Sequence, residues 1–311
     1  MGVRIHFLNV GSGDCTIVHF PYREVKNNQG QVIKTKEERI TFIDLNHYDD
    51  QAEYENVLNY YKNSNDFRDT NGKLKPIFRF ICSHPHMDHI YGLSKLFNDT
   101  ELEIINFWDL EHEFVPEDLD YNEQYQNDWE TYQEIRKGYT LRIIKTYRED
   151  SPRNYWKDYE DRITILSPSL KLIKMAHYNE DGSKKEQVEI DEMSYALLIR
   201  VNNKKIILGG DGQERVWNDI FENCKEEIAG CSVLKASHHG HESGFHEEAI
   251  KIMKPQFIVF SNSKQEDEQN GASDKYKMVL PNTTIYKTHE FRTIIADIPF
   301  NDTEDIAFYR S

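Results

Sequence analysis

One stretch of thirteen residues, from Ile81 to Leu93, constrains the fold of this chain more than any other. Four potential metal ligands fall within six positions of it, directly after an apolar run that is typical of a buried strand. His84 and His86 are two residues apart at a strand end, so their side chains can point the same way. Asp88 and His89 would open a helix, in which adjacent side chains point about 100° apart. One short turn can therefore aim two ligands at one cation and two at a neighbouring cation. The four ligands are His84, His86, Asp88 and His89.

The residue types in this turn favour metal binding over a structural role. A single histidine is more often structural, and a pair spaced H-x-H occurs by chance on protein surfaces. Four candidates at this spacing, straight after a buried-looking strand, are hard to explain as core or as solvated surface. Imidazole and carboxylate are the ligands that zinc, manganese and iron accept. The turn therefore predicts a metal centre.

Two further strand ends carry the same residue types. Asp211 ends the second strand of a predicted hairpin, residues 194–212, and the pair His238-His239 follows an apolar strand at residues 231–236. Strand ends are rigid positions at which distant parts of a chain can meet in one site. We therefore expect these two segments to converge on the histidine turn.

The turn S-H-P-H-M-D-H at residues 83–89, with Gly92-Leu93 after it, resembles the H-x-H-x-D-H signature of the metallo-β-lactamase superfamily. The resemblance implies an α/β fold of the αββα sandwich type, in which two stacked mixed β-sheets carry helices on their outer faces. It also implies a hydrolytic site with one or two metals. Residues 1–311 would form a single domain of this kind, with an insertion or lid at about residues 98–160.

Three more motifs resemble the branch of these metallohydrolases related to the soluble domain of ComEC, the DNA-uptake channel. They are N-V-G-S-G-D at residues 9–14, G-G-D at 209–211 and S-H-H-G-H-E-S at 237–243. The last resembles the S-H-H-G-x-x-S segment of the phosphodiester-cleaving branch. The resemblance implies a metal-dependent phosphodiesterase or nuclease that uses a metal-bridging hydroxide, with a nucleic acid or nucleotide as substrate.

The same resemblance implies two divalent metal ions, zinc or manganese, and a ligand set for them. The family pattern favours His239 over His238 as a ligand, but the sequence alone leaves that choice open. The ligands would be His84, His86 and Asp211 for one metal, and Asp88, His89, Asp211 and His239 for the other.

One position departs from the superfamily pattern. Members often carry another histidine on the turn that precedes the strand at residues 194–201, where this chain has Asp191-Glu192-Met193. A carboxylate from Asp191 or Glu192 would replace that imidazole in the first metal site. Such a change favours a harder ion such as manganese, with zinc as the default.

Three residues are the predicted catalytic groups: Asp14, Asp88 and His238. Two cations close together lower the pKa of a shared water from 15.7 towards about 7 and so supply hydroxide at neutral pH. Asp88 and Asp14 would orient this water or pass a proton, and His238 would donate to a leaving oxygen. By the same resemblance Asp44 orients the histidine turn, while capping of a helix at residues 49–61 is an equally good interpretation.

The net charge of −16 is concentrated in one segment. Residues 99–135 hold thirteen acidic side chains and no Lys or Arg, and residues 136–157 then hold seven basic ones. An acidic block repels phosphate backbones wherever it faces, whereas the basic stretch could contact them. Its aromatic residues would stack on bases. They are Tyr139, Tyr147, Tyr155 and Trp156.

The acidic block keeps two alternatives to the nuclease open. One is a hydrolase of a small ester, such as a phosphocholine-type diester or a lactone. The other is a non-catalytic, metal-stabilised protein that docks a basic partner through residues 99–135. No run of 18 apolar residues occurs, so no membrane span is expected, and four cysteines without a C-x-x-C pair favour a reduced, cytoplasmic setting.

Overall fold

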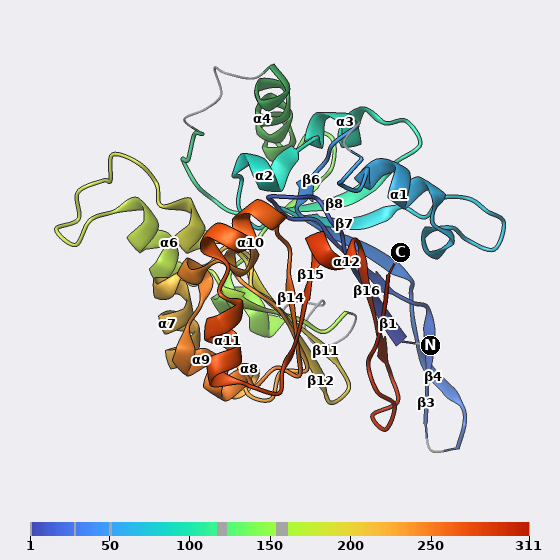
Figure 1. Ribbon diagram of the computed structural model, residues 1–311. Helices are drawn as coiled ribbons and strands as arrows, with labels where there is room; N and C mark the ends of the chain where they lie inside the picture. The colour runs from blue at the N-terminus through green and yellow to red at the C-terminus, as the bar shows by residue number, and fades with distance from the viewer. Residues whose placement is uncertain (1, 28, 50–51, 117–122, 154–160, 311) are drawn as a thin grey trace.

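The computed structural model describes residues 2–27, 29–49, 52–116, 123–153 and 161–310. Within these ranges the chain forms four layers: two sheets stack face to face, and helices cover the outer side of each (Figure 1). This is the αββα arrangement that the sequence predicts.

The first sheet has eight strands in the order β17-β16-β1-β2-β5-β7-β8-β9. Its neighbours are antiparallel from β17 to β5 and parallel from β5 to β9. The strands are β1 (Gly2–Phe7), β2 (Thr16–Phe20), β5 (Arg39–Ile43), β7 (Ile77–Ile81), β8 (Ile104–Asp109), β9 (Arg142–Lys145), β16 (Ile294–Pro299) and β17 (Ala307–Arg310).

The second sheet has six strands in the order β10 to β15, antiparallel up to β12 and parallel from there on. The sequence predicted a long, polar hairpin loop at residues 26–39, and in the structure this region contributes to a small separate hairpin of β3 and β4. The remaining strands are β3 (Arg23–Lys26), β4 (Val32–Lys36), β6 (Leu45–Asn46), β10 (Ile163–Ser167), β11 (Ala196–Val201), β12 (Lys204–Leu208), β13 (Val233–Lys235), β14 (Phe257–Phe260) and β15 (Thr284–Lys287).

Strand alternation divides the second sheet between two apolar cores. In β11, Leu197 and Ile199 belong to the core shared with the first sheet, whereas Ala196 and Leu198 pack with the outer helices. The same alternation in β13 puts Lys235 on the inner side, where it is buried. A lysine between two apolar sheets needs a partner, and that partner belongs to the site described below.

The helices lie outside the sheets, with α1, α3 and α4 beside the first and α7, α8, α9 and α11 beside the second (Figure 1). Among the described residues no helix is both long and apolar enough to cross a membrane. The helices are α1 (Val57–Asn63), α2 (Met87–Ile90), α3 (Leu93–Asn98), α4 (Glu123–Arg136), α6 (Leu170–His177), α7 (Glu214–Asn223), α8 (Lys225–Ile228), α9 (Glu247–Met253), α10 (Lys264–Asn270), α11 (Ser273–Val279) and α12 (Thr288–Phe291).

The helix expected after the histidine turn is divided in two by Gly92. This residue has a φ of +92°, and a Cβ on it would lie 2.6 Å from the Cβ of His47. Left-handed backbone and lack of space together require glycine here. The turn therefore keeps its own short helix, α2, and α3 leaves in a new direction.

The segment at residues 98–160 contains one well-anchored helix. The sequence predicted a largely exposed helix at residues 117–137; residues 117–122 lie outside the described ranges, and α4 follows them. Trp129 and Tyr132 of α4 are buried, and the carboxylate of Asp128 accepts hydrogen bonds from the backbone N–H groups of Gly92 and Ser94, at 2.7 and 2.8 Å. A carboxylate at the start of α3 is favourable because the helix dipole is positive there.

Candidate metal centre

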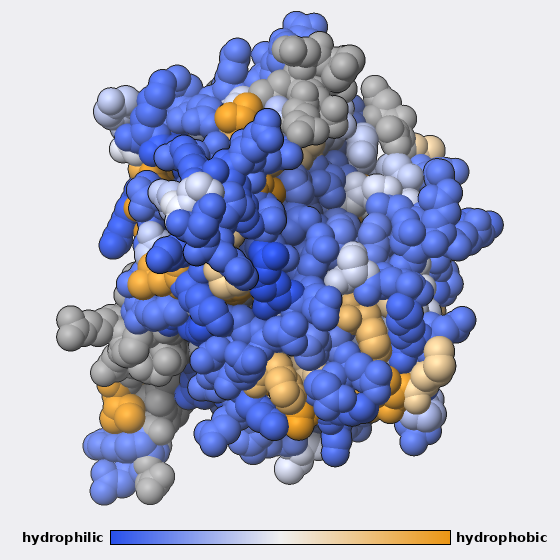
Figure 2. Space-filling model, turned by 90° about the vertical axis from the view of Figure 1, so that its left-hand side faces the viewer, coloured by the Kyte–Doolittle hydropathy of each residue, from blue (hydrophilic) through white to orange (hydrophobic). Residues whose placement is uncertain are grey.

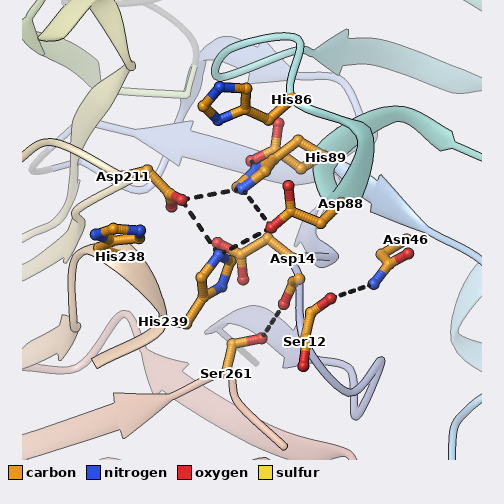
Figure 3. A network of polar contacts seen from close by, with 12 residues as sticks. Ser12, Asp14, Asn46, His86, Asp88, His89, Asp211, His238, His239 and Ser261 are labelled. Carbon is orange, nitrogen blue, oxygen red and sulfur yellow. Dashed lines mark hydrogen bonds and ion pairs between the residues drawn. The ribbon is translucent and has the colours of Figure 1, made fainter. Parts of the chain in front are cut away.

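The candidate ligands meet at one edge of the sandwich, where the parallel strands of both sheets end. Asp44 follows β5 and His84 follows β7 in the first sheet, while Asp211 follows β12 and His239 follows β13 in the second. Carboxyl ends of parallel strands share one edge, which is where α/β proteins place their sites. The convergence expected from the sequence is therefore present (Figure 3).

Asp211 is at the centre of the most compact group. Its Oδ2 atom lies 3.2 Å from Nε2 of His89 and 3.2 Å from Nε2 of His239 (Figure 3). Asp88 Oδ2 closes the ring, at 3.5 Å from Nε2 of His89 and 3.2 Å from Nε2 of His239. Three of these side chains are buried, whereas the Asp88 carboxylate is 40% exposed and faces the opening of the site.

A second group consists of His84, His86 and Asp191. Oδ1 of Asp191 lies 3.0 Å from Nδ1 of His86 and 3.5 Å from Nε2 of His84. Asp191 belongs to a short 3-10 helix, Ile190–Met193, and its Oδ2 accepts a hydrogen bond from Gln213 at 2.9 Å. His84 also lies 3.9 Å from Asp211, so the two groups adjoin each other.

The chemistry of these residues fits divalent cations. Oδ1 of Asp211 and Nδ1 of His239 are buried, and no described residue makes a hydrogen bond to either atom. Nε2 of His239 has ion-pair contacts with Asp211 and Asp88 without good hydrogen-bond geometry. Buried polar atoms without partners are costly, and here they converge on one point beside further carboxylates and imidazoles. Nitrogen and oxygen donors in this mixture suit zinc or manganese.

Electrostatics hold the group in a charged state when no cation is bound. Burial acts to lower the pKa of His239, but the carboxylate of Asp211 outweighs it and raises that pKa well above its usual range. Burial likewise acts to raise the pKa of Asp211, which His239 and His89 bring well below its usual range. A cation that binds here displaces the imidazole protons, so metal affinity should fall as pH falls.

Asp44 orients the histidine turn from beneath. Its carboxylate accepts a hydrogen bond from the backbone N–H of Ser83 at 2.6 Å and lies 2.9 Å from Nδ1 of His89. With Nδ1 donating to Asp44, the lone pair of Nε2 points to the cluster. The alternative prediction, that Asp44 caps the next helix, is wrong because Asn56 is the N-cap of α1.

The His238-His239 turn separates two neighbouring imidazoles. His238, His239 and Gly240 have successive positive φ angles of +50°, +58° and +91°. A left-handed backbone is costly for residues with side chains and persists where the surroundings impose it. The turn places His239 in the buried cluster, while His238 points elsewhere (Figure 3) and stays partly exposed. Nδ1 of His238 lies 2.6 Å from Oγ of Ser243.

Asp14 lies next to the cluster but is tied to the second sheet. Its Oδ2 forms an ion pair with Lys235, and its backbone N–H donates to the carbonyl of Asp88 at 3.1 Å. Ser261 holds the adjacent residue, since its Oγ donates to the carbonyl of Gly13 at 3.0 Å (Figure 3). Sequence reasoning missed Lys235, and the available signal was a lysine on an otherwise apolar strand.

A cavity of about 380 Å³ opens beside the exposed side of the ligands. Three of its lining residues belong to the histidine turn and α2, and three come from residues 98–160, so this segment does border the site. The lining residues are His86, Met87, Asp88, Phe114, Pro116, Tyr125 and Gln187.

Much of the basic stretch at residues 136–157 is engaged in ion pairs. Arg136 pairs with buried Asp109 at 2.9 Å, and Arg148 pairs with buried Asp219 at 2.6 Å. Lys145 contacts Glu111 at 3.1 Å. These contacts hold the local fold and reduce the charge available to a phosphate backbone. Residues 154–160, including Tyr155 and Trp156, lie outside the described ranges.

Comparison with known proteins identifies the fold. No family model matches the sequence, and no curated protein sequence does either. Igni18, described as a novel metallo hydrolase from the archaeon Ignicoccus hospitalis, aligns over 95% of this chain and all of its own, with a TM-score of 0.50 and 12% identity. Two further structures are weaker matches. Zinc-bound PqqB from Methylobacterium extorquens aligns over 94% of this chain and all of its own, with a TM-score of 0.47 and 10% identity. A variant of CmlA β-hydroxylase aligns over 95% of this chain and 54% of its own, with a TM-score of 0.47 and 9% identity. The αββα fold of two stacked mixed sheets with outer helices, expected from the sequence, is therefore confirmed.

Proposed function

We propose that this protein is a metal-dependent hydrolase of phosphodiesters. The observation that carries the proposal is the buried group around Asp211, in which ligand atoms of four side chains lie within 4.8 Å of one another. The sequence resemblance to the ComEC-like, phosphodiester-cleaving branch supports the choice of substrate. Such a group is expensive to bury unless it binds cations, which makes a purely structural role a poor explanation.

Two cations would be held by adjoining sets that share Asp211. The geometry favours Asp191 over Glu192 in the first set, because the Asp191 carboxylate contacts both histidines while Glu192 approaches Arg215 at 3.9 Å. The geometry also favours His239 over His238 as a ligand in the second set, because Nε2 of His239 lies 3.2 Å from both Asp88 and Asp211. The proposed ligands are His84, His86, Asp191 and Asp211 for one cation, and Asp88, His89, His239 and Asp211 for the other.

Cations bound here would acidify a water molecule and stabilise the negative charge that develops on phosphorus oxygens. The partly exposed carboxylate of Asp88 is placed to accept a proton at the opening of the site. His238 lies at the rim and would donate a proton to the leaving oxygen, with its ring held by Ser243. Asp14 is buried against Lys235, so we assign it a supporting role in place of the proton transfer expected from the sequence.

We propose a small diester as the substrate in preference to a nucleic acid. The ion pairs of Arg136 and Arg148 remove two of the phosphate contacts that the nuclease hypothesis needs. Hydrophilic residues cover most of the face shown in Figure 2, and hydrophobic ones appear there in small separate groups. Docking of a basic partner through residues 99–135 stays an alternative prediction.

A metal-by-substrate grid tests this function. Protein freed of metal with a chelator should not hydrolyse bis-p-nitrophenyl phosphate, and added zinc or manganese should restore the activity. Elemental analysis should approach two metal ions per chain. Lack of metal binding would refute the proposal, and faster cleavage of a lactone or a thioester would move the substrate class away from phosphodiesters.

The proposed roles of His238 and His239 can be distinguished, because replacing each residue should have a different effect on metal content and activity. His239→Ala should lower both metal content and activity, because it removes a ligand. His238→Ala should keep the metal content and lower kcat by about 100-fold, the usual size of a general-acid contribution. Metal analysis and steady-state kinetics on both variants give the answer. A loss of metal from His238→Ala, with none from His239→Ala, would reverse the assignment.

A further inference from the structure

The cavity beside the ligands has an aromatic wall. The ring of Phe114 lies edge-on to His86, with centroids 5.3 Å apart and planes at 73°. Tyr125 of α4 lines the same cavity and packs against Tyr91 at 5.3 Å and 85°. Phe114 is supported from behind by Trp129, at 6.3 Å. The two rings come from different parts of residues 98–160, and both are fixed by packing.

The charge of the cavity limits what it can receive. Among the described residues that line it there is no Lys or Arg, and its ionisable groups are His86 and Asp88, which we assign to the cations. A single phosphate would be neutralised at the cations themselves. Additional phosphates, as in a polynucleotide, would meet no positive charge on the described walls of the cavity. The part of the substrate that enters the cavity must therefore be uncharged.

The size and surface of the cavity suit a ring. A volume of about 380 Å³ is within the range of small-molecule pockets. Aromatic side chains bind flat groups through stacked or edge-to-face contacts, whereas a short alkyl group gains little from them. Gln187, which also lines the cavity, offers amide hydrogen-bonding groups that suit the edge of a heterocycle.

We propose that this cavity is a subsite for a flat, uncharged ring on the ester group that the substrate retains when the bond to the leaving group is cut, either an aryl group or a nucleobase. The substrate is then a small aryl or nucleoside phosphodiester. This inference rests on the proposed function, because the cations position the phosphate at the mouth of the cavity. Phe114 and Tyr125 are its specificity residues and take no part in the bond-breaking step.

Binding without turnover tests the subsite. Zinc- or manganese-loaded protein is titrated calorimetrically with phenylphosphonate and with methylphosphonate, which share the anionic group and differ in the ring. The wild type should bind phenylphosphonate at least about 10-fold more tightly, as expected for one well-packed ring. Equal affinities, or no binding of either compound, would overturn the inference.

Variants of Phe114 and Tyr125 show whether these two rings cause the preference for phenylphosphonate. Phe114→Leu keeps an apolar side chain in this buried position, and Tyr125→Leu alters a partly exposed one, so both should fold. Each should reduce the phenyl preference to within about 3-fold, with methylphosphonate affinity and metal content unchanged. Tyr139→Leu, at a side chain that is 86% exposed, is the matched control and should keep the preference. A preference that survives in both cavity variants would refute the assignment.

Substrate comparison separates this inference from the proposed function. Thymidine 5′-p-nitrophenyl phosphate and methyl p-nitrophenyl phosphate share the p-nitrophenyl leaving group and differ in whether the retained ester group carries a ring. The thymidine ester should have the lower KM, and Phe114→Leu should raise that KM while kcat changes little. If no phosphodiester is cleaved but the phenyl preference is present and depends on Phe114, the proposed function fails and the subsite stands. If diesters are cleaved without any preference for a ring, the subsite fails and the function stands.

Discussion

Replacing Asp211 with alanine should lower kcat/KM for bis-p-nitrophenyl phosphate by about 1,000-fold or more. Among the described residues, Asp211 has the carboxylate that contacts His89 and His239 and also approaches His84, so its removal should disconnect the two proposed ligand sets. Loss of a cation costs several kcal/mol of transition-state stabilisation, and each 1.36 kcal/mol is a factor of ten. Kinetics and metal analysis on the purified variant measure the effect.

The control for Asp211 is a carboxylate in a comparable cluster elsewhere. Asp267 lies near His289 and Glu290 and pairs with Lys287, but it belongs to neither proposed ligand set. Asp267→Ala should keep full activity and metal content. An Asp211→Ala variant that retained a tenth of the wild-type activity and all of its metal would show that Asp211 is not a bridging ligand.

Replacing Lys235 with methionine should destabilise the metal-free protein by about 3–5 kcal/mol, the usual cost of leaving one partner of a buried ion pair alone. Asp14 would then be a buried carboxylate without its cation, among Asp44 and the other acidic groups of the site. Chemical unfolding monitored by circular dichroism measures the change.

A double variant distinguishes a lost ion pair from a lost side chain. Lys235→Met combined with Asp14→Asn removes both charges, and it should recover at least half of the stability lost in Lys235→Met alone. Lys251→Met, at an exposed helical pair with Glu247, should leave the unfolding midpoint almost unchanged. If the double variant were as unstable as the single one, Lys235 would be important for packing and not for its charge.

The ion pair also explains how the two sheets keep their relative position at the site. Asp14 belongs to the turn after β1, and Lys235 is the last residue of β13. The backbone N–H of Asp14 donates a hydrogen bond to the carbonyl of Asp88, and Lys235 lies four residues before His239 in the sequence. The pair therefore joins the ligands of one sheet to those of the other.

The sequence was informative where one local segment carries both the chemistry and its geometry. The spacing of His84, His86, Asp88 and His89 predicts ligands because a strand end and a helix start fix their directions within a few residues. Asp211 and the pair His238-His239 became candidates for a similar reason, since each follows an apolar strand, but only the family resemblance favoured His239 over His238. The fold class was implied by the resemblance of these motifs to the metallo-β-lactamase superfamily, and the structure has the expected two stacked sheets.

Other features depend on residues that are distant along the chain, and only the tertiary structure decided them. From the sequence, Asp191 and Glu192 were equally good candidates for the first metal site. The structure favours Asp191 because the 3-10 helix Ile190–Met193 directs its carboxylate to His86. The sequence also suggested that Arg136 and Arg148 could contact a phosphate backbone. In the structure they form ion pairs with the buried carboxylates of Asp109 and Asp219.

The sequence by itself indicated which side chains are candidate ligands, because residue type and strand-end spacing are local properties. The tertiary structure decided which of them share a site, what supports them and what the site opens onto. The partnership of Asp14 with Lys235 and the wall formed by Phe114 and Tyr125 join segments that no local pattern relates. Packing of the two sheets and of α4 sets those distances, and packing energy is distributed over the whole core.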